Sequence, residues 1–364
     1  ALVLWADIEK QLGDHVKSQM YEAFAQKLKT NFNKPTTQGG FWDEEKKCYV
    51  HWLDKDGSVH GNNMVTPVNF MAIAYGICDD ENRTKKILDD IEVQMQKENL
   101  FFWPLCMYSY APGEGNDWQF PFPNYENGDI FLSWGAVGVK AYASYKPELA
   151  LKYVKNVLAQ YAKDGLAFQR YGRVKQDGLG DDILSGNCLT VVGLYQAIYG
   201  INPLHNRFYL DPHITKDLEG TEVRYRYRDQ ILSVGLDMND YQVSDGVHRI
   251  RASADFGFSS KGGQLQYFRG RSDTPSLTVT VDPAGELGLD VRNWMDDAVR
   301  FTVDTKGRVP VNLKCSAGHL LPEHNYDVIL NGKKLKTVKS DANGMFSFSF
   351  GSSSDPAVIV LNGN

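Results

Sequence analysis

The chain has 364 residues, 42% of them apolar, and a net charge of −6. This length and apolar content suffice for two or three domains with buried cores, and the acidic balance argues against a nucleic-acid or membrane-surface role. Every apolar stretch is far shorter than a transmembrane span. Aromatic residues make up 12% of the chain, and many fall in loop-like segments, where sugar binding and burial are both possible roles.

The five cysteines are scattered and none forms a CxxC pair. An odd, unpatterned set argues against both a disulfide framework and a zinc site. The sequence also contains no phosphate-binding loop and no dinucleotide fingerprint. Neither a cofactor nor a metal ion is therefore expected.

The first hundred residues predict helices joined by a hairpin. Residues 3–32 predict one long helix, because apolar residues recur at every fourth position. These positions are Leu4, Ile8, Leu12, Val16, Met20, Phe24 and Leu28. A short strand or hairpin is expected around residues 49–53, followed by a turn at 54–57, and Thr66 and Pro67 predict the N-cap and first position of the next helix.

Two kinds of helix alternate along residues 1–203. Apolar helices rich in small residues are expected over 66–77, 130–145 and 184–199, and amphipathic, charged helices over 3–32, 80–97 and 147–163. Because an apolar helix is buried and an amphipathic helix faces water, the alternation predicts an inner ring of helices wrapped by an outer ring. Three helices of each kind make half of a twelve-helix double ring; an open solenoid of helical hairpins is the structural alternative.

A long segment, residues 98–128, is rich in Pro, Gly and aromatic residues and shows no helical or strand period. A loop of this length inside a compact domain is usually functional. We therefore expect it to contribute to a binding or catalytic site.

After Pro203 the period changes to two, and short strands separated by turns predict an antiparallel β-sandwich. Residues 307–364 predict hairpins, with an Asn-Gly turn signal at Asn331 and a second turn signal at 341–344. The expected domains are 1–203, the helical catalytic region; 204–306, a capping sandwich; and 307–364, a small β-rich region. The last forms either a separate sandwich or an extra layer.

Three segments, residues 41–88, 125–145 and 184–236, resemble inverting glycoside phosphorylases of the cellobiose and chitobiose phosphorylase type. The segments occur in the order and spacing of that family, and the resemblance covers about residues 1–240. The wider superfamily of (α/α)6-barrel glycosidases also includes hydrolases. The resemblance implies a mixed α and β fold, in which the C-terminal half of an (α/α)6 barrel precedes the antiparallel sandwich.

The sequence departs from the phosphorylases at two points. Asn187 stands where their phosphate site has a threonine, and their Glu-Pro-Tyr segment before the last inner helix has no counterpart. These differences favour hydrolysis over phosphorolysis, and Asn187 stays a candidate ligand of the sugar.

The resemblance also implies where the rest of the machinery lies. In these families the general acid comes just before the long outer helix, which begins here at Ala1. Either the chain is a fragment, or a second polypeptide completes the barrel. The strands after residue 307 resemble appendages of secreted bacterial polysaccharide-degrading enzymes, which implies a secreted or periplasmic protein.

Inverting hydrolysis needs two carboxyl groups, one that protonates the leaving oxygen and one that activates a water molecule. In barrel hydrolases of this superfamily the base tends to precede the final inner helix, so the resemblance implies Asp182 as the base and Asp181 as the second choice. Either residue could instead cap that helix. Glu126 is the next candidate, as a base or as a ligand of sugar hydroxyls.

The other candidates are expected to bind the sugar. They are Tyr125, Asn127, Asp129, Trp118, Trp42, His60 and Arg170. Burial would explain the rings equally well, Asp129 could cap its helix, and Arg170 could pair with Asp177 or Asp181 rather than with an anionic substituent.

The sequence thus favours an inverting glycoside hydrolase that acts on an oligosaccharide or polysaccharide. A glycoside phosphorylase is the first alternative. A non-catalytic carbohydrate-binding fragment is the second, and it predicts sugar binding without turnover.

Overall fold

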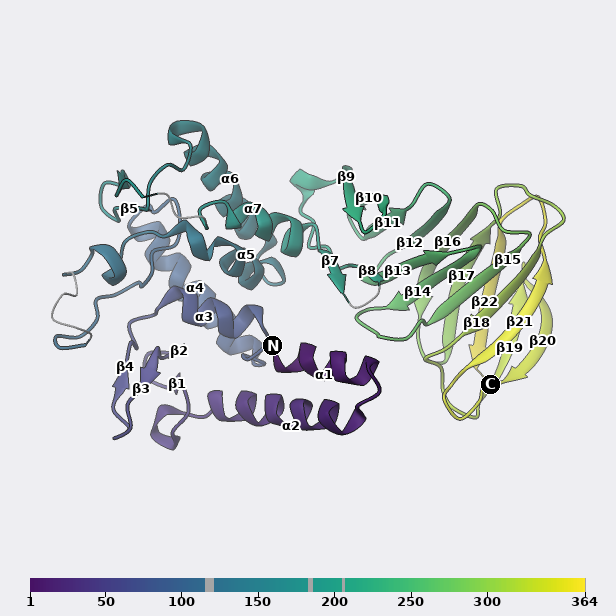
Figure 1. Ribbon diagram of the computed structural model, residues 1–364, viewed down its shortest axis with the longest axis horizontal. Coiled ribbons are helices and arrows are strands. Elements are labelled where there is room, and N and C mark those ends of the chain that lie inside the picture. The colour runs from purple at the N-terminus through teal and green to yellow at the C-terminus, as the bar shows by residue number, and fades with distance from the viewer. Residues whose placement is uncertain (115–120, 183–185, 205–206, 364) are drawn as a thin grey trace. The chain divides into compact units, whose positions relative to one another are not determined.

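The computed structural model describes residues 1–114, 121–182, 186–204 and 207–363. The chain divides into two compact units, residues 1–194 and residues 195–364. The first unit is mainly helical and the second is built mainly from β-strands (Figure 1). The predicted mixture of helices and antiparallel strands is confirmed, whereas closure of the helices into half of an (α/α)6 barrel stays a prediction.

The single helix predicted for the N-terminal segment is wrong, because the chain forms two helices there. α1 spans Leu2–Gln11 and α2 spans His15–Phe32. Gly13 separates them with a φ of +87°, a left-handed conformation that glycine adopts without strain. Asp14 then caps α2, since its carboxylate accepts a hydrogen bond of 3.0 Å from the backbone N–H of Lys17. The two helices pack side by side as a hairpin (Figure 1).

Two short hairpins follow. β1 (Trp42–Asp43) pairs with β2 (Cys48–Tyr49), and β3 (Trp52–Leu53) pairs with β4 (Val59–His60). The strand or hairpin expected around residues 49–53 is thus divided between two pairs, and the expected turn at 54–57 connects β3 and β4, with a hydrogen bond of 2.9 Å from Gly57 to Asp54. A third pair, β5 (Arg170–Tyr171) with β6 (Gly178–Leu179), follows the last long helix.

Over residues 66–164 the predicted alternation of helix types is found in the structure. The remaining helices of the described chain are α3 (Thr66–Ala74), α4 (Glu81–Lys97), α5 (Gly135–Ala143), α6 (Pro147–Asp164) and α7 (Leu189–Gly193), with a π-helical turn, η4, at Leu194–Ile198. α3 and α5 bury most of their residues, whereas α4 and α6 bury one face each. Short 3-10 helices lie at Thr36–Gln38 (η1), Tyr125–Asn127 (η2), Leu132–Trp134 (η3) and Lys216–Leu218 (η5).

The predicted start of α3 is one residue off. Val65 is the N-cap, Thr66 is the first helical residue and Pro67 is the second. The Thr66 hydroxyl does not cap the helix; it donates instead to the carbonyl of Pro104. This bond ties the start of α3 to the aromatic-rich segment that follows α4.

The second unit is a sandwich of two sheets. Within its described residues, one sheet has nine strands in the order β20-β19-β22-β17-β16-β12-β11-β10-β9 and the other has seven in the order β21-β18-β15-β14-β13-β8-β7. The strands are β7 (Ile201–Leu204), β8 (Arg207–Leu210), β9 (Thr221–Tyr227), β10 (Gln230–Asp237), β11 (Asp240–Ser244), β12 (His248–Ala252), β13 (Phe256–Lys261), β14 (Gln264–Arg269), β15 (Leu277–Asp282), β16 (Leu287–Trp294), β17 (Ala298–Asp304), β18 (Asn312–Ala317), β19 (Asn325–Leu330), β20 (Lys333–Lys339), β21 (Phe346–Gly351) and β22 (Ala357–Gly363). Alternate residues of most strands are buried, and those of the two sheets form one hydrophobic core.

The strands after residue 307 join both sheets of this sandwich. β18 pairs with β15 in one sheet, and β22 pairs with β17 in the other. The sequence left open whether this segment forms a separate sandwich or an extra layer. In the structure its strands extend the two existing sheets and share their hydrophobic core.

The two turn signals of this segment have different outcomes. Asn331 and Gly332, with φ values of +48° and +79°, connect β19 and β20 in the predicted hairpin. The turn at 341–344 connects β20 to β21, which lie in different sheets. It is therefore a crossover between sheets and not a second hairpin.

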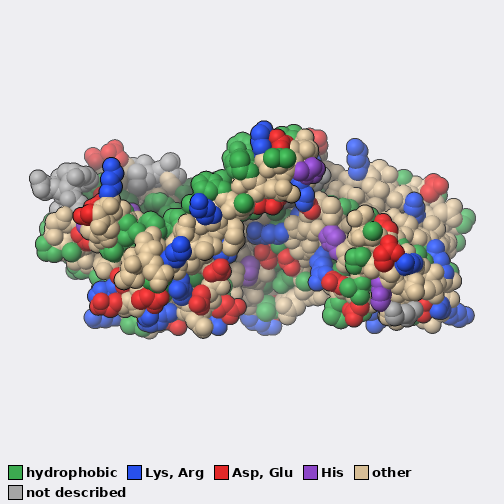
Figure 2. Space-filling view, turned by 90° about the horizontal axis from the view of Figure 1, so that it is seen from below, with side chains coloured by type: hydrophobic (Ala, Val, Ile, Leu, Met, Phe, Trp, Pro, Cys, Tyr) green, Lys and Arg blue, Asp and Glu red, His purple; other side chains and the backbone are tan. Residues whose placement is uncertain are grey.

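No helix in the described ranges is long and apolar enough to cross a membrane. On the face of the molecule shown in Figure 2, acidic and basic side chains are interspersed.

Candidate active site

Three segments of the helical unit lie side by side although they are distant in the sequence. Backbone hydrogen bonds join Met107 to Met64 at 3.1 Å and Tyr108 to Asn63 at 3.2 Å. On the other side, Leu105 donates to the carbonyl of Asp129 at 2.9 Å. The aromatic-rich loop therefore runs between the β3–β4 hairpin and the segment that precedes α5, and these segments carry most of the candidate residues.

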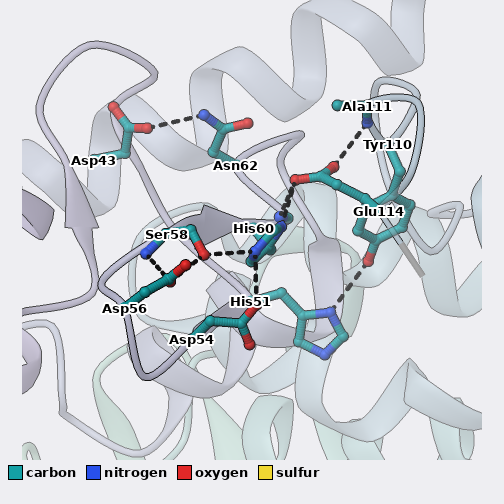
Figure 3. Close-up of polar contacts among 11 residues, drawn as sticks. Asp43, His51, Asp54, Asp56, Ser58, His60, Asn62, Tyr110, Ala111 and Glu114 are labelled. Carbon is teal, nitrogen blue, oxygen red and sulfur yellow. Dashed lines mark hydrogen bonds and ion pairs between the residues drawn. The ribbon is translucent and has the colours of Figure 1, made fainter.

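His60, at the end of β4, is the centre of a polar cluster (Figure 3). Its Nε2 lies 3.1 Å from the Asp54 carboxylate and 3.2 Å from the Ser58 hydroxyl. Its Nδ1 lies 3.4 Å from Glu114 Oε1, outside hydrogen-bond geometry. The Trp52 ring stacks on the imidazole with centroids 4.9 Å apart. Asp54, Ser58 and Trp52 thus fix the imidazole of His60 in place. Its expected role as a polar group of the sugar site stays a prediction.

Glu114 is a carboxylate that the sequence interpretation did not single out. Its Oε2 accepts a hydrogen bond of 2.7 Å from the backbone N–H of Ala111, and its Oε1 accepts one of 3.3 Å from that of Gly61. Its side chain is only 11% exposed. The only sequence feature that could have indicated Glu114 is its position in the loop rich in Pro, Gly and aromatic residues. A single Glu between two glycines belongs to no hydrophobic period, so the sequence does not indicate its contacts.

Tyr110 links this cluster to the next segment. Its hydroxyl lies 3.2 Å from Nδ1 of His51, and its backbone N–H donates to Oδ1 of Asn127 at 3.1 Å. Burial raises the pKa of the Tyr110 phenol, and negative charge near it, including that of Glu114 and Glu126, raises it further. Burial also lowers the pKa of His51 below its ordinary value, which favours a neutral ring at neutral pH.

Tyr125, Glu126 and Asn127 form the short helix η2. The guanidinium of Arg170 lies over the Tyr125 ring, 4.8 Å from its centroid. Asn127 is buried, whereas Glu126, which lies between Tyr125 and Asn127 in the sequence, is exposed to solvent. The loop therefore presents one accessible carboxylate next to a fixed ring and close to Tyr110.

Asp129 and Arg170 form an ion pair with each other. Asp129 is 2% exposed, and its Oδ2 accepts hydrogen bonds from Nε of Arg170 at 2.8 Å and from the backbone N–H of Tyr125 at 2.7 Å. The favoured pairing of Arg170 with Asp177 or Asp181 is therefore wrong. Asp129 also caps no helix, because the N-caps of η3 and α5 are Phe131 and Trp134. Its carboxylate instead connects η2 to β5 through its bonds to Tyr125 and Arg170.

Arg173 anchors the same region from below the surface. It is 2% exposed and donates to the Glu98 carboxylate at 2.5 and 2.6 Å. It also donates to the carbonyls of Cys106 at 2.7 Å and Met107 at 2.9 Å. Its donors therefore hold the aromatic-rich loop.

Trp42 and Asn187 lie in places unsuited to a ligand. Trp42 is 2% exposed, with the Arg83 guanidinium 4.4 Å from its ring centroid, so no face of the ring is free for a sugar. Asn187 is buried, and its amide donates to the carbonyls of Leu166 at 3.0 Å and Phe168 at 2.7 Å. The binding roles expected for both residues stay predictions.

Asp181 and Asp182 are exposed residues at the end of a described range. Helix α7 begins only at Leu189, with Cys188 as its N-cap, so neither aspartate caps it. Their predicted role as base stays a prediction. Trp118 lies outside the described residues.

The arrangement provides the chemical groups that sugar recognition requires. Tyr125 and Trp52 supply rings, and Glu126 supplies a carboxylate that water can reach. Such a carboxylate can accept a proton from water or from a sugar hydroxyl. Within the described ranges, no group of three or more His, Cys, Asp or Glu side chains is placed to hold a metal ion.

Comparison with known proteins gives one family. The family model described as Trehalase matches residues 2–186. No curated protein matches the chain.

Among solved structures, the chain is similar to the GH63 mannosylglycerate hydrolase from Thermus thermophilus. In the complex with glucose the identity is 14% and the TM-score 0.39, over 52% of this chain and 43% of that chain. In the complex with Tris and D-glycerate the values are 16% and 0.35, over 50% and 38%. The chain therefore spans less than half the length of these structures.

Proposed function

Because the chain belongs to the trehalase family of glycoside hydrolases, we propose that it hydrolyses glycosidic bonds with inversion at the loops of its helical unit. The family match ends at residue 186, so it lies within the helical unit and does not extend to the sandwich. The observation that carries the proposal is the grouping of Trp52, His60, Tyr110 and Glu126 on adjacent loops.

In this proposal Glu126 is the general base. An inverting enzyme needs a carboxylate that removes a proton from water as the water attacks the anomeric carbon. Glu126 fits this role because it is accessible and because its two neighbours, Tyr125 and Asn127, are fixed. Asp182 and Asp181 are kept as the alternative base, since both are exposed carboxylates in the same unit.

The other residues of the site would bind and orient the sugar. The ring of Trp52 is partly exposed beside His60 and offers a surface for the C–H face of a pyranose. Glu114 would fix the loop through its bonds to Ala111 and Gly61 rather than react. We propose trehalose as the first substrate to assay, because the family takes its name from it.

The experiment is a rate assay on trehalose and a panel of other glucosides with matched variants. Glu126→Gln removes the proton acceptor and is expected to lower kcat by about 10²- to 10⁴-fold. Glu148→Gln, an exposed carboxylate in the first turn of α6, is the control and should leave kcat unchanged. A normal rate for Glu126→Gln with a large loss for Asp182→Asn would move the base to Asp182. Sugar binding without turnover of any glucoside would instead favour the non-catalytic alternative.

Phosphorolysis is tested in the same assay. If a water molecule attacks, inorganic phosphate leaves the rate unchanged and the free sugar is released. Formation of a sugar 1-phosphate that depends on phosphate would replace hydrolysis by the phosphorylase alternative.

We further propose that a second polypeptide completes the helical unit by covering the α1–α2 hairpin. Among its residues α1 buries only Ala6 and α2 buries only Ser18. The apolar stripe of the hairpin is left exposed; Leu12 is 77% and Val16 79% exposed. Its members are Val3, Leu4, Trp5, Ile8, Leu12, Val16, Met20, Phe24 and Leu28. Exposed apolar side chains in this number on one helical hairpin support a protein interface there.

Native mass spectrometry of the purified protein tests the partner. The account expects the 41.0 kDa chain to travel with a second, non-identical polypeptide. A chain that is found alone, or only with copies of itself, would contradict this part of the proposal.

A further inference from the structure

The sandwich unit has a cleft of about 470 Å³ of its own. It lies where the chain crosses from β12 in one sheet to β13 in the other, and β14 and β16 contribute its remaining residues. The cleft is therefore formed wholly within residues 195–364, apart from the candidate site in the helical unit. Its volume is in the range of small-molecule binding sites.

The base of the cleft is apolar and aromatic. Ala252, Tyr267, Val291 and Trp294 line it and are all buried. The rings of Tyr267 and Trp294 lie 5.6 Å apart between centroids. The indole N–H of Trp294 is buried and has no hydrogen-bond partner within the described residues. An unpaired buried donor is costly, and a ligand oxygen that reaches the base of the cleft would satisfy it.

The rim of the cleft is polar. Ser253, Arg269, Arg292 and Asn293 are exposed, and Asp255 is partly exposed. β16 has an irregular register between Val291 and Asn293, which places an extra residue at the rim. Such bulges frequently redirect side chains beside binding sites.

The arginines of the rim have carboxylate partners, and Asp255 is hydrogen-bonded. Arg269 donates to the Asp296 carboxylate at 2.8 Å, and Arg292 pairs with Asp290 at 2.6 Å. Asp255 accepts a hydrogen bond of 2.6 Å from the Tyr209 hydroxyl. Because no charge of one sign dominates, the cleft suits a neutral ligand that offers many hydroxyl groups to donors and acceptors.

We propose that this cleft is a second carbohydrate-binding site, which takes one neutral pyranose residue. One sugar hydroxyl would accept a hydrogen bond from the indole N–H of Trp294 at the base, and the other hydroxyls would bind the polar rim. The site is non-catalytic, and its occupancy does not depend on the function proposed for the helical unit.

Saturation-transfer NMR of the full chain tests the site, with methyl α-glucoside, methyl α-mannoside and methyl β-galactoside as probes. The account expects one of these to bind, and Asn293→Ala and Arg269→Ala each to weaken that binding about tenfold or more. Asn362→Ala and Arg300→Ala, exposed residues of the same types on β22 and β17, should leave it unchanged.

Two results would overturn the proposal: no binding of any of the three sugars, or binding that both rim variants leave intact. The test is separate from that of the hydrolase. Glu126→Gln should retain the rim-dependent binding, and Asn293→Ala should retain turnover. Failure of one proposal therefore does not imply failure of the other.

Discussion

At the scale of single residues, the anchor between Arg173 and Glu98 decides how the aromatic-rich loop is held. Arg173 is buried and has four hydrogen bonds to Glu98, Cys106 and Met107. Arg173→Met removes them and leaves buried carbonyls and a carboxylate unpaired. We expect it to lower the free energy of unfolding by about 3 kcal/mol.

Urea unfolding followed by circular dichroism measures this loss. Arg251→Met is the control, because Arg251 pairs with Asp240 at the surface and is 44% exposed, and it should cost less than about 1 kcal/mol. Equal effects of the two substitutions would contradict the anchoring role.

The same pair predicts a pH dependence. The hydrogen bonds from Arg173 hold the pKa of Glu98 below its ordinary value of 4.5. A lowered folded-state pKa contributes stability that is fully present above the unfolded pKa and is lost as the pH falls through the folded pKa. The destabilisation caused by Arg173→Met should therefore be larger at about pH 6 than at about pH 3. A loss that is constant between the two pH values would exclude this linkage.

The sequence predicted residue types at the site better than their partners. Hydrogen bonds join Asn127 to Tyr110 and Gly61 to Glu114, so the segments that carry Tyr125, Asn127 and His60 lie close together, while their roles toward a sugar stay predictions. Trp42 and Asn187 are buried among partners that the sequence did not indicate, and Glu114 was missed. A side chain's partners come from segments tens of residues away, and a single sequence does not record which segments those are.

At the scale of elements, α5 depends on glycines for its close packing. A Cβ at Gly138 would lie 2.4 Å from the Trp103 ring, which is itself buried. Trp103 packs against Tyr142 and Tyr153 and has no room to move aside. Gly138→Ala should therefore destabilise the helical unit by about 1–3 kcal/mol.

Thermal unfolding checks this against a glycine with free space. Nothing lies within 4 Å of a Cβ at Gly351, and its φ is not positive, so Gly351→Ala should be neutral or slightly stabilising. If Gly138→Ala is equally harmless, the packing described for α5 is incorrect.

The α1–α2 hairpin makes a different prediction, because its apolar stripe is exposed. Phe24 is 51% exposed, so Phe24→Glu should change the stability of the isolated chain by less than about 0.5 kcal/mol. It should nevertheless release the second polypeptide, since a charge is buried unpaired in that interface. Glu22→Lys, an exposed charge on the same helix, should retain it, as judged by native mass spectrometry.

The type of a helix could be predicted where its hydrophobic period was strong, whereas the residues at which the helices begin and end could not. The alternation of α3, α4, α5 and α6 follows from hydrophobic period alone. The break at Gly13 and Asp14 was missed, since the every-fourth-residue stripe continues across it. Two helices with one continuous stripe and a single long helix have the same apolar period.

At the scale of the whole molecule, the two proposed sites lie in different units. The helical unit contains the whole family match and the loops assigned to hydrolysis, and the sandwich contains a cleft of its own. The period of the strands predicted the sandwich. It could not predict that the strands after residue 307 join both sheets, because strand order depends on long-range pairing that period does not encode.

Proton NMR of the sugar anomers released from trehalose tests the central claim most directly. Trehalose joins two α-linked glucose units, so inverting hydrolysis releases one β-glucose and one α-glucose, whereas retaining hydrolysis releases α-glucose alone. The account predicts β- and α-glucose in equal amounts before mutarotation, and loss of both signals in Glu126→Gln. Release of α-glucose alone, or unchanged release by Glu126→Gln and Asp182→Asn alike, would contradict it.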